Sequence, residues 1–156
     1  MKRALHLLSV IIAAVLCLCS CGKTVESADE ASSVTISDFE EISFSIKSCY
    51  KGAVTYTVCS TEEDFLFYEG HQFAYVEKRV GGSWYPLVRR PVNSTGDFQH
   101  ASVPTEEKTE TISIHSFYGG KLENGTYRLV APCYLSDEDL SNMENPVYLA
   151  AEFEIG

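Results

Sequence analysis

Hydrophobic and polar residues alternate along most of the chain beyond residue 38. In the stretch ISFSIK, residues 42–47, the two isoleucines and the phenylalanine share one face, and both serines and the lysine share the other. A period of two residues is typical of a strand with one buried face and one solvated face. The same alternation recurs in residues 53–60, 72–80, 83–88, 111–117, 126–132 and 147–155. No segment of ten or more residues has a helical stripe, so the pattern predicts about seven short strands.

Turn signals between these stretches favour an all-β fold, an immunoglobulin-like antiparallel β-sandwich over residues 38–156. Gly81 and Gly82 separate two alternating stretches, and a Gly-Gly pair suits the positive φ angles of a tight hairpin turn. Gly125 and Tyr127 open a later stretch, where a tyrosine corner would bond back to the upstream backbone. An ordinary hairpin turn followed by a core tyrosine is the alternative at this point.

The first 21 residues have the pattern of a secretory signal. Lys2 and Arg3 precede an apolar run that ends in the stretch LCLCSC, and this run is shorter than the about 20 apolar residues that cross a bilayer. Its last four residues resemble a bacterial lipobox, whose final cysteine is lipidated and becomes the mature N-terminus. Neither Cys-x-Cys pair has the two-residue gap of zinc or redox sites. We therefore expect a signal peptide over residues 1–20 and a lipidated Cys21, with an uncleaved membrane anchor as the alternative.

Composition adds a tether and excludes one class of partner. Because two of the 12 basic residues leave with the signal peptide, the net charge falls from −10 to −12 in the mature chain. Phosphate binding requires a basic surface, so nucleic acid is not an expected partner. Residues 21–37 are rich in Ser, Ala, Thr and acidic residues and poor in apolar ones. They predict a flexible tether between the lipid and the single domain.

Three stretches carry a family resemblance: FAYVEKRVGGSWYPL, SFYGGKLENGTYRLVAP and the terminal AEFEI. Together they resemble the bacterial immunoglobulin-like domains of small secreted or lipid-anchored proteins of Gram-positive bacteria, over residues 40–156. The resemblance implies the fold and a cell-surface location, and it supplies no catalytic residues. Leu129 is a departure from antibody domains, which carry their second core cysteine two places after the tyrosine of the corner.

Three aromatic residues are candidates for a ligand or partner surface: Trp84, Tyr85 and Tyr118. Aromatic side chains are enriched at contact surfaces. They are also needed to fill the space between two sheets. We expect Trp84 to lie in the core, whereas both interpretations stay open for Tyr85, which points to the opposite face.

Two acidic loops would meet at one end of the sandwich in an immunoglobulin-like order. Their carboxylates make a calcium site the weaker alternative to an ordinary solvated surface. The residues concerned are Glu62, Glu63 and Asp64 in one loop and Asp137 and Asp139 in the other.

A disulfide between Cys59 and Cys133 is geometrically conceivable, because both cysteines would lie at strand ends on the same end of the sandwich. Strand alternation argues against the bridge, since it directs Cys59 outward and Cys133 inward. Reduced cysteines are the favoured interpretation.

Catalytic patterns are missing from the sequence: it has no nucleophile elbow, no HExxH and no Gly-rich phosphate loop. We expect a protein that is not an enzyme, has no cofactor and is lipid-anchored on the extracytoplasmic face of the cell membrane. Its domain would act as an interaction or adhesion module for another surface protein or a cell-wall glycan. A small-ligand or calcium-binding lipoprotein associated with a transporter or sensor is the alternative.

Overall fold

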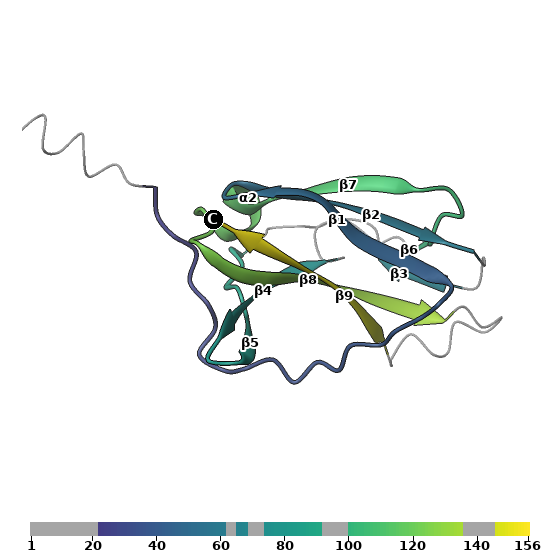
Figure 1. Ribbon diagram of the computed structural model, residues 1–156, viewed down its shortest axis with the longest axis horizontal. Helices are drawn as coiled ribbons and strands as arrows, with labels where there is room; N and C mark the ends of the chain where they lie inside the picture. Colours follow the sequence, from purple (N-terminus) through teal and green to yellow (C-terminus); the bar gives the residue numbers. More distant parts are fainter. Residues whose placement is uncertain (1–21, 62–64, 69–73, 92–99, 136–145) are drawn as a thin grey trace, which may run out of the picture.

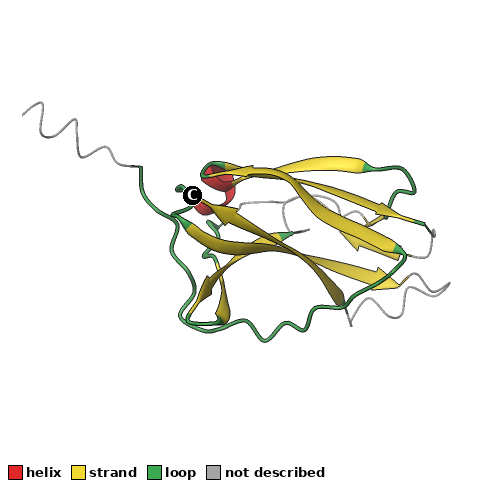
Figure 2. Cartoon of the chain, viewed as in Figure 1, coloured by secondary structure: helices red, strands yellow, loops and turns green. Residues whose placement is uncertain are grey.

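The computed structural model describes residues 22–61, 65–68, 74–91, 100–135 and 146–156. These residues form two antiparallel sheets that pack face to face (Figure 1, Figure 2). The arrangement confirms the predicted all-β sandwich. The first sheet has the order β1-β2-β7, with β1 at Ile42–Tyr50, β2 at Ala53–Ser60 and β7 at Lys108–Ser113.

The second sheet is built around β8, Gly125–Leu135. Its other strands are β3 at Phe65–Tyr68, β4 at Tyr75–Val80, β5 at Ser83–Pro86, β6 at His100–Ser102 and β9 at Val147–Ile155. β2 pairs with β1 and β7, and β8 pairs with β4 and β9. These neighbours reproduce the A-B-E and C-F-G pairings of immunoglobulin domains.

One edge of β8 is shared by two short strands. Phe67 of β3 pairs with Cys133, and Tyr75 of β4 pairs with Val130. Tyr75 follows Phe67 by eight positions along the chain, whereas their partners Cys133 and Val130 are only three positions apart on β8. The chain from β3 to β4 is therefore five residues longer than continuous pairing with β8 would need. β9 occupies the opposite edge of β8 from Gly125 to Cys133 without such a break.

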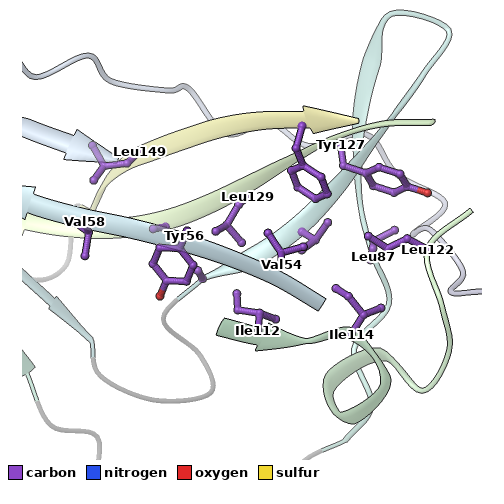
Figure 3. Packing of buried hydrophobic residues seen from close by; sticks show 14 of the residues in the cluster. Val54, Tyr56, Val58, Leu87, Ile112, Ile114, Leu122, Tyr127, Leu129 and Leu149 are labelled. Carbon is purple, nitrogen blue, oxygen red and sulfur yellow. The ribbon is translucent and has the colours of Figure 1, made fainter. Parts of the chain in front are cut away.

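Alternation along the strands selects the residues that meet between the sheets (Figure 3). Val54, Tyr56 and Val58 of β2 face Tyr127 and Leu129 of β8, and all five are no more than 1% exposed. Burying a side chain of this size contributes roughly 1.5–3 kcal/mol to folding. Other members of this core are Ile42, Val76, Leu87, Val103, Ile112, Ile114, Leu122, Leu149, Phe153 and Ile155.

The stretch predicted as a strand over residues 111–117 is a strand only at its start. β7 ends at Ser113, and the helix α2 follows at Ile114–Tyr118. Ser113 caps this helix, since its hydroxyl accepts a hydrogen bond from the backbone N–H of Ser116 at 3.3 Å. Among the described residues, no helix is long and apolar enough to cross a membrane.

The tyrosine corner is present at the start of β8. The hydroxyl of Tyr127 donates a hydrogen bond to the backbone carbonyl of Glu123 at 3.0 Å, and its ring stacks on Phe153 with 5.6 Å between centroids. The bond to a residue four positions upstream is the one that distinguishes a corner from an ordinary hairpin turn.

The segment expected to be a flexible tether instead lies along the sandwich. Residues 23–37, here called the N-terminal strap, run past the β4–β5 hairpin to the start of β1 (Figure 1). Ala28 and Ser32 donate backbone hydrogen bonds to the carbonyls of Pro86 and Trp84, each at 2.7 Å. Ser37 donates to the carbonyl of Tyr148 at 2.8 Å. Composition does not predict this placement, because the bonds use backbone groups and need few apolar side chains.

Candidate functional site

The outward side of the three-stranded sheet carries several hydroxyl side chains. We call it the hydroxyl face, and its members are Ser43, Ser45 and Ser48 of β1, Thr55 and Thr57 of β2, and Thr109 and Thr111 of β7. Strand pairing sets two of its rows, because Ser45, Thr57 and Thr109 lie side by side, as do Ser48, Thr55 and Thr111. None of the seven side chains carries a charge, although the whole chain has a net charge of −10.

Hydrogen bonds between strands hold several of these hydroxyls in place. Ser45 Oγ lies 2.9 Å from Thr57 Oγ1, and Thr55 Oγ1 lies 2.9 Å from Thr111 Oγ1. A hydroxyl has one donor and two acceptor positions, so each keeps capacity for a further partner. Ser43, Ser45, Ser48, Thr109 and Thr111 are exposed. These five residues therefore offer donors and acceptors to solvent or to a ligand, whereas Thr57 is only 7% exposed and holds its neighbour Ser45 in place.

The outward side of the second sheet holds a buried ion pair. Glu77 of β4 is 0% exposed, and its Oε2 accepts a hydrogen bond from Nε of Arg128 at 2.6 Å. The two residues are direct neighbours in the pairing of β4 with β8. The guanidinium of Arg128 lies 4.7 Å from the ring centroid of Trp84, a distance at which a cation is attracted to the ring face. Charges buried in this way need a partner, and Arg128 supplies one at Oε2, whereas Oε1 of Glu77 is buried without a hydrogen-bond partner among the described residues.

The N-terminal strap crosses this outward side. Ser32 is bonded to Trp84 on β5, and Ser37 is bonded to Tyr148 on β9, which lies beyond β4 and β8. The core fills the inner side of the sheet, so the strap passes over the outer side. Val130 points outward from β8 yet is 0% exposed, which is consistent with a covered surface.

The three aromatic candidates do not form one platform. Trp84 lies on the outward side of β5, because it pairs with Arg79 and is in line with the outward Glu77, and it is not a member of the core cluster. The expected core position of Trp84 is therefore wrong. Tyr85 points to the opposite side and is half-buried beside Ala28 of the strap.

Tyr118 is excluded as a surface residue. It is 6% exposed, and its hydroxyl accepts a hydrogen bond from the backbone N–H of Val76 at 2.9 Å. The residue belongs to α2, which packs Ile114 and Tyr118 into the core, whereas the predicted strand ended at residue 117 and left Tyr118 in the following loop.

The cysteines of the described part of the chain are reduced, so the disulfide considered between Cys59 and Cys133 is not formed. The two residues belong to different sheets. Burial raises the pKa of the Cys133 thiol to about 11, which makes it a poor nucleophile at neutral pH.

The weak calcium candidates Glu62, Glu63, Asp64, Asp137 and Asp139 lie outside the described residues, and so does Cys21. Within the ranges that the structure describes, no group of three His, Cys, Asp or Glu side chains is placed to hold a metal ion.

No family model, curated protein or solved structure matches this chain. The hydroxyl face was missed in the sequence, although its signal is visible there: Ser and Thr occupy the outward positions of SFSIKS, TYT and TET.

Proposed function

We propose that the protein is a lipid-anchored, extracytoplasmic, non-catalytic binding module that recognises a cell-wall glycan through the hydroxyl face. The observation that carries this proposal is the row structure of the face, in which Ser45, Thr57 and Thr109 lie side by side across three strands. Glycans are rich in hydroxyl groups, and a hydroxyl pairs equally well as donor or acceptor.

The chemistry of the face favours a glycan over a protein partner. Protein interfaces depend on a few buried aromatic or arginine anchors, and the hydroxyl face contributes none from its seven residues. Lys47 lies at its margin, where Nζ donates a hydrogen bond to Thr109 Oγ1 at 3.2 Å. None of the seven residues is a carboxylate. An anionic polysaccharide would therefore meet less electrostatic repulsion at the hydroxyl face than at the acidic remainder of the surface.

The lipid anchor is supported by the sequence LCSC at residues 18–21, which resembles a lipobox, and by the signal pattern that precedes it. The substitution Cys21→Ala is expected to move the protein from the detergent phase to the aqueous phase in a detergent phase-partitioning experiment. Unchanged partitioning would contradict lipidation at this residue.

Glycan binding is tested with detergent-solubilised full-length protein and insoluble peptidoglycan in a sedimentation assay. The variant Ser45→Arg with Thr111→Arg places two long side chains on the hydroxyl face. Loss of two hydrogen bonds of about 1 kcal/mol each weakens binding by roughly 30-fold. The matched control is Ser83→Arg with Thr105→Arg, since both positions are exposed and lie off the face.

The control variant is expected to bind as the unsubstituted protein does. Equal loss in both variants, or no sedimentation of the unsubstituted protein with peptidoglycan, would contradict the proposal. Thermal melting of both variants separates lost binding from lost folding.

A further inference from the structure

Basic side chains gather at the end of the sandwich where the described chain begins. We call this end the basic pole and define it by Lys23, Lys51, Arg90 and Lys121. Two surface hollows meet there, one lined by Lys23 and Arg90 and the other by Lys51 and Lys121. Together with Arg89, these hollows are lined by five basic residues and by only two acidic ones, Glu26 and Glu123. The excess of basic residues at this end is opposite in sign to the net charge of −10 of the whole chain.

Both acidic residues form ion pairs, Glu26 with a lysine of the pole itself and Glu123 with a lysine outside it. Glu26 pairs with Lys23 at 3.5 Å, and Glu123 pairs with Lys78 at 2.7 Å. Neither Lys51 nor Lys121 forms an ion pair with any carboxylate in the part of the chain that the structure describes. Both lysines are exposed, so their charges face solvent.

The basic pole lies next to the residue proposed to carry lipid. Only Gly22 separates Cys21 from Lys23, whose carbonyl accepts a hydrogen bond from the backbone N–H of Lys121 at 3.0 Å. A side chain at Gly22 would lie 3.6 Å from Nζ of Lys121. Two residues span at most about 7 Å of extended chain. The Cα atoms of Cys21 and Lys23 are therefore no more than about 7 Å apart, which places the residue proposed to carry lipid next to the pole.

Backbone bonds keep the pole close to that point. Val25 donates a hydrogen bond to the carbonyl of Lys121 at 3.2 Å, and Leu122 donates to the carbonyl of Lys51 at 2.8 Å. The strap, the β1–β2 turn and the loop after α2 are thus joined at the pole. Tyr50, which is 65% exposed, stands beside Lys51, and exposed tyrosines suit the boundary between headgroups and water.

We propose that the basic pole docks on anionic phospholipid headgroups of the bilayer that holds Cys21, so that the sandwich stands on this end. The inference rests on the proposed lipid anchor and adds a second, electrostatic contact to it. The remaining acidic surface is directed away from the bilayer. The hydroxyl face begins at the pole, where β1 and β2 meet in the turn at Lys51, and extends away from the membrane.

The test uses the full-length lipidated protein in vesicles of phosphatidylglycerol with phosphatidylcholine, and in vesicles of phosphatidylcholine alone. A water-soluble acylating reagent modifies lysines, and mass spectrometry measures each one. Lys51 and Lys121 are expected to react several-fold more slowly in the anionic vesicles. Lys47 and Lys108 serve as internal controls and are expected to react equally in both. Equal reactivity of Lys51 and Lys121 in the two vesicles would overturn the proposal.

Charge reversal provides the second measurement. Each basic residue near an anionic surface contributes about 1 kcal/mol, or roughly fivefold in binding. In the variant Lys51→Glu with Lys121→Glu the acylation rate is measured at Lys23. This rate is expected to be the same in the two kinds of vesicle. Lys47→Glu with Lys108→Glu changes the net charge equally and is expected to leave the difference intact. If both variants abolish the difference, the effect is one of net charge; if neither does, the pole does not contact the bilayer. Either result would overturn the docking.

Failure of the anchor is distinguishable from failure of the docking. The mass of the N-terminal peptide shows whether Cys21 carries lipid. An unmodified Cys21 would overturn the proposed anchor and this inference with it. A lipidated Cys21 with equal lysine reactivity in both vesicles would overturn only the docking.

Discussion

The outward sides of the two sheets differ in what covers them. On the three-stranded sheet, Ser45 and Thr111 point outward and are exposed. On the six-stranded sheet, Glu77 and Val130 also point outward, yet both are 0% exposed. Strand alternation therefore separates the two sides of a sheet but does not say whether the outer side meets water. In this protein the outer side of the second sheet also carries an ion pair against Trp84, and the N-terminal strap is bonded to β5 and β9 of that sheet.

Breaking the buried ion pair is expected to have the largest effect. Arg128→Met leaves the Glu77 carboxylate buried without its cation, and loss of one partner of a buried pair costs about 3–5 kcal/mol of unfolding free energy. Chemical denaturation measures this loss. The double variant Glu77→Leu with Arg128→Met is expected to recover most of it, because the buried charge is then gone. A single variant as stable as the parent would show that this side of the sheet is open to water.

Detaching the strap is expected to have a smaller effect. Ala28→Pro removes the N–H that bonds to the Pro86 carbonyl, which costs about 1–3 kcal/mol of unfolding free energy. Ala31→Pro is the matched control, since Ala31 is exposed and its N–H has no backbone partner among the described residues. Equal thermal melting of the two variants would indicate that the strap is not bonded at this position.

Removal of the hydroxyl at the tyrosine corner tests a buried polar contact within the core region. Tyr127→Phe leaves the ring stacked on Phe153 but deletes the hydrogen bond to the Glu123 carbonyl. The expected loss is about 1 kcal/mol of unfolding free energy, measured by urea denaturation. A neutral result would mean that the corner does not contribute to stability.

Removal of a hydroxyl from the hydroxyl face is expected to have the smallest effect on folding. Thr111→Val keeps a β-branched side chain and deletes the exposed hydroxyl that contacts Thr55. The unfolding free energy should change by no more than about 0.5 kcal/mol, as is usual at the surface. A loss as large as that of Tyr127→Phe would assign the face a structural role and weaken the binding proposal.

Much of the sandwich could be predicted because the alternation of apolar and polar residues is visible in the sequence of each strand by itself. Val54, Tyr56 and Val58 follow one another at every second position, and the same period places Tyr127 and Leu129 opposite them. The start of α2 could not be found in this way, since Ile112 and Ile114 continue the alternation across the end of β7. Tyr118 lies one residue beyond the predicted strand, so its burial by α2 was not predicted.

The strap and the position of Trp84 depended on contacts that no local pattern records. The strap bonds of Ala28 and Ser32 use backbone N–H groups, which every residue except proline possesses. The pairing of Trp84 with Arg79 decides which side of β5 bears Trp84. The two-residue turn before β5 does not by itself decide whether that side faces the core. The hydroxyl face was recoverable from Ser and Thr at alternate positions, but only the pairing of three strands shows that they form rows.

Hydrogen exchange of the full-length protein, resolved to single amides, tests most directly whether one outer side is covered and the other open. The strap amides of Val25, Ala28, Ser32 and Ser37 are expected to exchange far more slowly than an unstructured peptide, because each donates a backbone hydrogen bond. Protection of these amides would support the strap as a fixed part of the domain. Exchange at the rate of an unstructured peptide would contradict the account and restore a flexible tether between Cys21 and the sandwich.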